Sequence, residues 1–206
     1  MPNGTPAPTF VDLRQESDGW IKKYVLTYAM PDGSTYEYES ASRKSLEAYR
    51  RELEGNAAGE KPPADAVCIV PQTPDGQLLL IREFRYPLNS WCIAFPAGLV
   101  DPGEDLASCV DRELREETGF ALRADLGAAA IDALPQPGFS STGLTDETVH
   151  VVFAQVERVA DAQPEPAEFI EPFLLPINDV PRFLAENATP IGTRAQLVLE
   201  AFARRR

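Results

Sequence analysis

One stretch constrains this chain more than any other: residues 98 to 120, GLVDPGEDLASCVDRELREETGF. Near its end stand Glu113, Glu116 and Glu117, three and four residues apart, a spacing that places them on one face of an α-helix. Like charges at this spacing repel one another, so a helix selected for stability alone would avoid them. We interpret the three glutamates as ligands of a hard cation that prefers oxygen.

The apolar pattern predicts that this helix runs over residues 104–119. Its apolar residues recur at every fourth position: Leu106, Val110 and Leu114. At roughly 100° per residue, Glu117 falls on the apolar side and Glu113 and Glu116 fall at its edge. The solvent-facing residues are then Ser108, Asp111 and Arg115. The glutamates therefore border the core, where an uncompensated charge is costly.

Composition narrows the class of protein. A length of 206 residues suits one good-sized domain or one domain with a small appendage. There is no run of 18 apolar residues, and the N-terminus lacks the basic and apolar regions of a signal peptide, so we expect neither a membrane span nor secretion. Three cysteines (Cys68, Cys92 and Cys109) without zinc spacing are typical of buried thiols in a cytoplasmic protein.

The net charge of −13 disfavours nucleic acid as a partner, because nucleic-acid binders carry a basic face. An acidic protein that acts on an anionic substrate needs a metal ion and a few well-placed arginines.

Turn and linker signals divide the chain near residue 60. Residues 1–17 are Pro-rich and predict a loose lead-in. Strands over 20–28 and 34–40 flank a turn at 31–33, and a helix over 45–54 follows, with Ser45 as its N-cap. Residues 56–64 form a linker by composition. We predict an N-terminal β-subdomain over 1–60, which is too small to be stable alone, and a second domain over 61–206.

The second domain alternates strands and helices. We predict strands at 65–71, 77–85, 91–95, 149–156 and 168–175, with strand-like character over 121–133. A long loop spans 134–148, and two helices close the chain at 179–186 and 190–204. This order indicates an α/β protein.

The central stretch resembles the Nudix box. Gly98 is followed after five residues by Glu104, and after seven more by the run from Arg112 to Phe120, RELREETGF. Phe120 stands where an aliphatic residue is usual. A solvated Glu-rich helix would explain the glutamate spacing alone, but not the whole motif. The resemblance implies a Nudix fold, which is a mixed β-sheet sandwiched between α-helices, here with a small N-terminal β-subdomain.

The same resemblance implies the hydrolytic chemistry. The side chains of Glu113, Glu116 and Glu117 and the carbonyl of Ala97 would bind Mg²⁺ or Mn²⁺, which polarises a pyrophosphate and activates a water molecule. Arg112 would pair with Glu104 and brace the loop against the helix. Two glycines, Gly98 and Gly103, would let that loop turn tightly.

Two further segments are similar to the ADP-ribose pyrophosphatase branch of this family: residues 82–87, REFRYP, and residues 91–98, WCIAFPAG. The likeness implies that Arg85 contacts the diphosphate, although a surface ion pair is an alternative for this residue. Ala94 stands where the branch usually has a glutamate, which puts the substrate preference and the metal count in question.

The loop from Ser141 to Glu147, STGLTDE, resembles the Ser-Pro-Gly-x-x-x-Glu loop of that branch, with Thr142 in place of proline. Glu147 would then be the general base. The alternatives are that Glu147 is a solvated loop carboxylate and that Glu116 or a metal-bound hydroxide serves as the base.

The N-terminal part is also similar to the branch, in which a small sheet crosses to a partner chain. Trp20 and Tyr38 occupy the positions of aromatics that stack on adenine, and Arg43 that of a ligand-binding arginine. Packed aromatics of a small sheet are the alternative. The likeness implies a homodimer.

Together these features predict a Mg²⁺-dependent enzyme that hydrolyses a nucleoside diphosphate sugar, with ADP-ribose giving AMP and ribose 5-phosphate. Another sugar nucleotide such as GDP-mannose, or NADH, is an alternative substrate. A non-catalytic ADP-ribose sensor is an alternative function. We expect no nucleic-acid or membrane partner.

Overall fold

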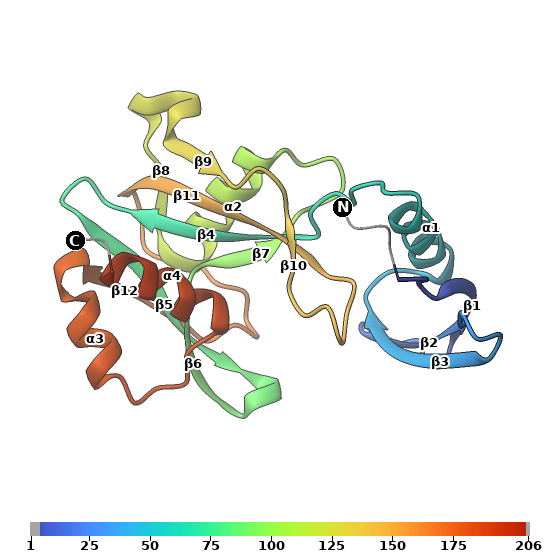
Figure 1. Ribbon diagram of the computed structural model, residues 1–206. Coiled ribbons are helices and arrows are strands. Elements are labelled where there is room, and N and C mark those ends of the chain that lie inside the picture. The colour runs from blue at the N-terminus through green and yellow to red at the C-terminus, as the bar shows by residue number, and fades with distance from the viewer. Residues whose placement is uncertain (1–4, 205–206) are drawn as a thin grey trace. The chain divides into compact units, whose positions relative to one another are not determined.

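The computed structural model describes residues 5–204, so the first four residues of the predicted lead-in lie outside it. Its elements are shown in chain order in Figure 1. The contacts divide the chain into two compact units. The first runs up to Ala64 and also includes Gly138–Val149, and the second contains Asp65–Pro137 and the chain from His150 onward. The sequence pattern does not reveal that Gly138–Val149 groups with the N-terminal residues.

The first unit is built on a three-stranded antiparallel sheet in the order β1-β2-β3. Its strands are β1 (Thr9–Gln15), β2 (Lys22–Ala29) and β3 (Thr35–Ser42). The predicted hairpin is confirmed in β2 and β3. The prediction of a loose lead-in is wrong for residues 9–15, which pair with β2. The physical reason is burial, since Leu13 is 4% exposed and packs in the core of this unit.

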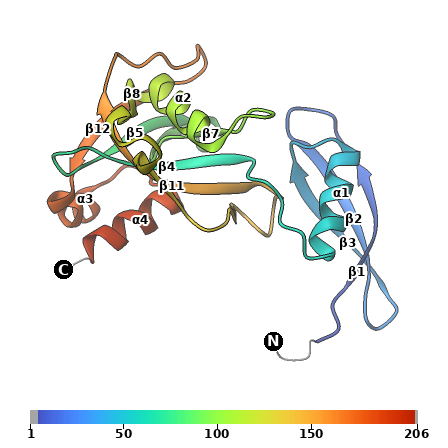
Figure 2. The same cartoon turned by 90° about the horizontal axis from the view of Figure 1, so that it is seen from above.

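Helix α1 (Leu46–Ala57) packs against this sheet, as Figure 2 shows. The hydroxyl of Ser45 accepts from the backbone N of Ala48 at 3.3 Å, which confirms the predicted N-cap. The core of the unit consists of Leu13, Tyr24, Leu26 and Tyr49. Burial raises the pKa of Tyr49 to about 12, and its hydroxyl lies 2.8 Å from that of Ser40.

The second sheet has the strand order β10-β11-β4-β5-β12, and four shorter strands pair with its members. The long strands are β4 (Ala66–Gln72), β5 (Gln77–Arg85), β11 (Thr148–Arg158) and β12 (Ile170–Pro176). The shorter strands are β6 (Ser90–Ala94), β7 (Ala97–Leu99), β8 (Phe120–Leu122), β9 (Ile131–Ala133) and β10 (Gly138–Phe139).

Helices cover both faces of this sheet. Helix α2 (Leu106–Thr118) and helix α4 (Thr193–Ala203) lie on opposite sides of β4 and β11, as Figure 2 shows, and α3 (Val180–Glu186) precedes α4. Apolar residues of α2 pack with those of β4, β5 and β11: Val67, Ile69, Leu79, Val110, Leu114, Val152, Ala154 and Val156. The predicted α/β sandwich of the Nudix fold is therefore confirmed.

Two details of the second unit differ from the sequence prediction. Residues 124–130, expected to be strand-like, form the 3₁₀ segment η2 (Ala124–Ala130). Gly127 adopts φ 52° there, a left-handed conformation that breaks an extended chain. Strand β7, which follows Pro96, has no counterpart in the predicted elements.

Two other 3₁₀ turns, η1 (Tyr86–Leu88) and η3 (Ile177–Asp179), join neighbouring elements. Across residues 5–204, no helix is both long and apolar enough to cross a bilayer.

Candidate functional site

Helix α2 presents the glutamates of the central motif, and its ends are well defined. Asp105 caps the N-terminus by accepting from the backbone N atoms of Ala107 and Ser108 at 3.0 and 3.1 Å. The helix stops at Gly119, whose φ of 74° is left-handed. A Cβ at Gly119 would lie 2.4 Å from the carbonyl oxygen of Ala160, so only glycine fits.

The three glutamates differ in burial. Glu113 is 9% exposed and Glu117 is 5% exposed, whereas the side chain of Glu116 is 50% exposed. The core-side placement of Glu117 is confirmed. Glu113 lies deeper than the edge position predicted for it, because a neighbouring glycine makes room for its carboxyl group.

That glycine is Gly98, and the structure corrects the role predicted for it. Gly98 lies in the extended strand β7, where Val67 of β4 is its partner. A Cβ at Gly98 would lie 1.9 Å from the carboxyl carbon of Glu113. The prediction of a tight turn at Gly98 is therefore wrong. Position 98 requires glycine because a side chain there would collide with the carboxyl group of Glu113. The turn belongs to Gly103, whose φ is +82°.

Strand β7 also brings the backbone of Ala97 to the second buried carboxylate. The N–H of Ala97 donates to Oε2 of Glu117 at 3.1 Å. Ala97 pairs with Cys68 in the middle of the sheet, so its backbone is held in a fixed place. The residue predicted to offer a carbonyl to the metal thus lies beside one of the predicted carboxylate ligands.

Arg112 links the loop to the helix. It donates to both carboxylate oxygens of Glu104 at 2.9 Å, which confirms the predicted brace. It also donates to the carbonyl of Leu99 at 3.0 Å and to Glu113 at 2.7 Å. Its contact with Glu116 is longer, at 3.3 Å. The hydrogen bond from Arg112 lowers the pKa of Glu104 to about 2.

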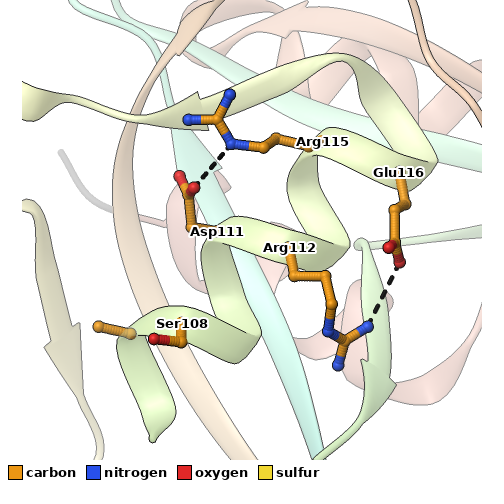
Figure 3. Close-up of a pocket in the computed structure, with 6 residues that line it drawn as sticks. Ser108, Asp111, Arg112, Arg115 and Glu116 are labelled. Atoms are coloured by element: carbon orange, nitrogen blue, oxygen red, sulfur yellow. Dashed lines mark hydrogen bonds and ion pairs between the residues drawn. The ribbon is translucent and has the colours of Figure 1, made fainter. Parts of the chain in front are cut away.

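The opposite side of α2 is an ordinary solvent-facing surface. A shallow depression of about 550 Å³ lies along it, shown in Figure 3. The residues that line it are Ala107, Ser108, Asp111, Arg112, Arg115 and Glu116. Arg115 pairs there with Asp111 at 2.7 Å. The predicted exposure is confirmed for Ser108 and Arg115, whereas Asp111 is half-buried. Neither Glu113 nor Glu117 lines the depression.

Burial dominates the electrostatics of Glu113 and Glu117. It raises the pKa of Glu113, against the opposing effect of Arg112. It raises the pKa of Glu117 well above the ordinary value, and the charge of Glu113 adds to this effect. Two such carboxylates are hard to ionise together, and a bound cation would offset the repulsion between their charges.

The residues fit a hard cation by their chemistry. Glu113, Glu116, Glu117 and the carbonyl of Ala97 offer only oxygen atoms, the ligands that Mg²⁺ prefers. In the part of the chain that the structure describes, no three His, Cys, Asp or Glu side chains already converge on one point. Glu116 is turned toward Arg112, and an exposed ion pair of this kind costs little to break.

Two carboxylates near the buried pair have no counterpart among the sequence predictions. The charges of Glu83, on β5, and Glu168, just before β12, both raise the pKa of Glu117, and that of Glu168 also raises the pKa of Glu113. Glu83 lies within the segment 82–87, but no role was predicted for either residue from the sequence. For Glu83, the available signal was strand geometry alone, because successive side chains of a strand point to opposite faces of the sheet.

Arg85 has not been brought into this cluster. Its side chain is 54% exposed and pairs with Glu83 at 2.5 Å. This contact is the surface ion pair that the sequence left open as an alternative for Arg85.

The remaining predicted residues belong to the first unit. Arg43 pairs with Glu147 at 2.7 Å, and the hydroxyl of Ser140 donates to the other oxygen of Glu147 at 2.6 Å. The hydroxyl of Tyr38 donates to the carbonyl of Gly143 at 2.7 Å. Trp20 lies in the bend before β2 and is 73% exposed. The structure thus joins the predicted ligand-binding arginine to the predicted general base.

Comparison with known proteins identifies the family. The sequence model of the NUDIX domain matches residues 62–194. The chain is 31% identical over 174 residues to the ADP-ribose pyrophosphatase of Saccharomyces cerevisiae, a match that covers 82% of this chain and 70% of that protein. It is 28% identical over 192 residues to the ADP-sugar pyrophosphatase of Mus musculus, covering 88% and 77% respectively.

A solved structure described as an ADP compounds hydrolase superposes with a TM-score of 0.72 at 20% identity, covering 98% of this chain and 95% of that one. This likeness supports the fold alone. Together with the NUDIX match and the geometry around α2, it leads to one conclusion: the chain belongs to the Nudix family and is a Nudix hydrolase.

Proposed function

We propose that this protein hydrolyses the pyrophosphate bond of a nucleoside diphosphate sugar, with ADP-ribose as the preferred substrate and AMP and ribose 5-phosphate as products. The observation that carries the proposal is a pair of buried carboxylates: Glu113, which lies against Gly98, and Glu117, which accepts from the N–H of Ala97. The names of the yeast and mouse relatives support the substrate class.

The cation is Mg²⁺, with Mn²⁺ as a substitute, held by Glu113, Glu116, Glu117 and the carbonyl of Ala97. When bound, the metal supplies charge that polarises the pyrophosphate and activates a water molecule. The chain provides the frame for this chemistry. Arg112 fixes the loop to α2 through Glu104, and strand β7 keeps the Ala97 backbone beside Glu117.

Glu147 is our proposed general base, and Arg43 holds its carboxylate at 2.7 Å. Glu168 is the competing base, because its charge already acts on both buried glutamates. Replacing each with glutamine separates the two. The true base gives the larger fall in kcat, and in its variant the dependence of kcat on pH loses the acidic limb.

The proposed recognition residues are Trp20 and Tyr38 for adenine and Arg43 and Arg85 for the rest of the ligand. Stacking on an exposed aromatic suits a purine, and Trp20 is 73% exposed.

We further propose a homodimer, which light scattering on the purified protein tests. Three buried free cysteines support a cytoplasmic location, because a reducing compartment keeps thiols in the reduced form.

The test is a panel of ADP-ribose, GDP-mannose and NADH with Mg²⁺, in which a phosphatase releases phosphate from the products. Wild type should prefer ADP-ribose, and Glu116→Gln should lose about a thousandfold in kcat. Arg115→Gln is the matched control, because it changes the next residue on the exposed face of α2. Equal inactivity of wild type and Glu116→Gln on the whole panel refutes the proposal. Tight ADP-ribose binding without turnover identifies a sensor instead.

A further inference from the structure

Two adjacent basic residues in the first unit meet two adjacent acidic residues. Arg43 and Lys44 follow β3, and Asp146 and Glu147 precede β11. Arg43 pairs with Glu147 at 2.7 Å, and Lys44 pairs with Asp146 at 2.8 Å. The two chain segments therefore form a double ion pair between residues about one hundred positions apart in the sequence.

The two pairs differ in burial. The side chain of Asp146 is 8% exposed and that of Lys44 is 20% exposed, against 23% for Glu147 and 30% for Arg43. The inner pair also receives the hydroxyl of Ser42, which donates to Oδ2 of Asp146 at 3.0 Å. Shielding from water strengthens the inner pair, whereas the outer pair keeps part of its surface for a ligand.

Backbone contacts extend this attachment along β3. The N–H of Ala41 donates to the carbonyl of Leu144 at 2.8 Å, and Ala41 and Thr145 form a parallel bridge. The hydroxyl of Tyr38 reaches the carbonyl of Gly143. The segment 143–147 is thus tied to the edge of β3 at successive points, with the inner ion pair next to the outer one.

We propose that Asp146 is a positioning residue, which acts through Lys44 and Ser42 to hold Glu147 and Arg43 in register. This inference rests on the proposed function, in which Arg43 binds the substrate. Neither Asp146 nor Lys44 needs to touch the substrate. Their charges fix which residue of the loop faces Arg43, and a shift of one residue would place Asp146 or Thr148 there instead of Glu147.

A double-mutant cycle tests whether Asp146 works through Arg43. Asp146→Asn keeps the size of the side chain and removes its charge. We expect this change to raise KM for ADP-ribose about tenfold, the effect of one lost charge-assisted hydrogen bond. Arg43→Ala should raise KM by at least as much. In the Arg43→Ala background, Asp146→Asn should raise KM no further. If the two substitutions instead raise KM by the product of their separate effects, the inference is overturned.

Charge and packing are separated by two further variants. Lys44→Arg keeps the charge and should retain KM within about threefold of wild type. Lys44 also pairs with Glu52 of α1 at 2.9 Å. Combining Lys44→Met, Glu52→Leu and Asp146→Leu replaces Lys44 and both of these carboxylates by apolar groups, so this triple variant should fold with a near-normal melting temperature and still show the raised KM. A wild-type KM in this triple variant contradicts the proposal. Glu39→Gln is the matched control, because it removes only the exposed pair of Lys23 and Glu39 on the same sheet.

Hydrogen exchange of the Ala41 amide reports the attachment without any substrate. Asp146→Asn should speed this exchange about tenfold, and Glu39→Gln should leave it unchanged. Absence of turnover by wild type would refute the proposed function. Unchanged Ala41 exchange in Asp146→Asn would refute the positioning role, whatever the activity of wild type.

Discussion

The carboxylate cluster of α2 and the ion-paired segment of the first unit are assembled in opposite ways. Glu113 and Glu117 come from one continuous stretch, and the glycine that admits Glu113 lies only fifteen positions before it, at Gly98. Arg43 and Glu147 are 104 positions apart and meet only because a loop folds onto the edge of β3. The contiguous cluster was visible as a motif, whereas the long-range pair was visible only as two separate residues.

The two regions also differ in what their charges cost. The buried carboxylates of α2 have raised pKa values, so their ionised forms are unfavourable until a cation binds. In the first unit, Asp146 and Glu147 each have a basic partner within 2.8 Å. We therefore expect changes at α2 to abolish turnover and changes in the first unit, apart from the proposed base Glu147, to weaken binding.

The largest effect is expected for Glu117→Gln. It should lower kcat about a thousandfold, because the ion loses a charged ligand. The metal-free variant should melt a few degrees above metal-free wild type, because a neutral amide is cheaper to bury than a carboxylate. Calorimetry with and without Mg²⁺ measures this, and added Mg²⁺ should stabilise wild type alone. A lower melting temperature for the metal-free variant would contradict our view of the buried pair.

Gly98→Ala should come next, with a fall of about a hundredfold in kcat/KM, since the new methyl group must displace the carboxyl of Glu113. Gly138→Ala is the matched control, because a Cβ there meets no atom within 4 Å. Steady-state kinetics on both variants check the prediction. Full activity in Gly98→Ala would show that Glu113 can move without loss.

Trp20→Ala should raise KM for ADP-ribose about tenfold and leave kcat nearly unchanged, because stacking stabilises the bound substrate and transition state alike. Initial rates over a range of ADP-ribose concentrations separate the two constants. A lower kcat at constant KM would show that Trp20 does not bind the substrate. It would also contradict the assignment of turnover to α2 and of binding to the first unit.

The smallest effect is expected for Ser45→Ala, which removes the N-cap of α1 and should cost about 1 kcal/mol of folding free energy. Ser45→Asp should restore it, since aspartate caps equally well. Urea unfolding measures both variants. Because the hydroxyl of Ser45 only caps α1, kcat should not change, and a large fall in kcat would tie α1 to the chemistry.

Much of the fold was predictable from local patterns. The apolar period of α2, the hairpin of β2 and β3 and the cap at Ser45 all follow from residues close in sequence. Strand β1 was missed because Pro-rich composition masks a strand whose stability comes from burying Leu13 against other elements. Strand β7 was missed because three residues carry too little pattern to be detected.

The sequence alone identified the Nudix motif, and the spacing of Glu113, Glu116 and Glu117 within it is the basis of our proposal of a hard cation. Tertiary structure alone decided which of these carboxylates are buried and why position 98 must be glycine. It also decided that Arg43 and Glu147 form a pair beside that of Lys44 and Asp146. The physical reason is that helical spacing is set by local geometry, whereas burial and long-range ion pairs depend on which segments pack together.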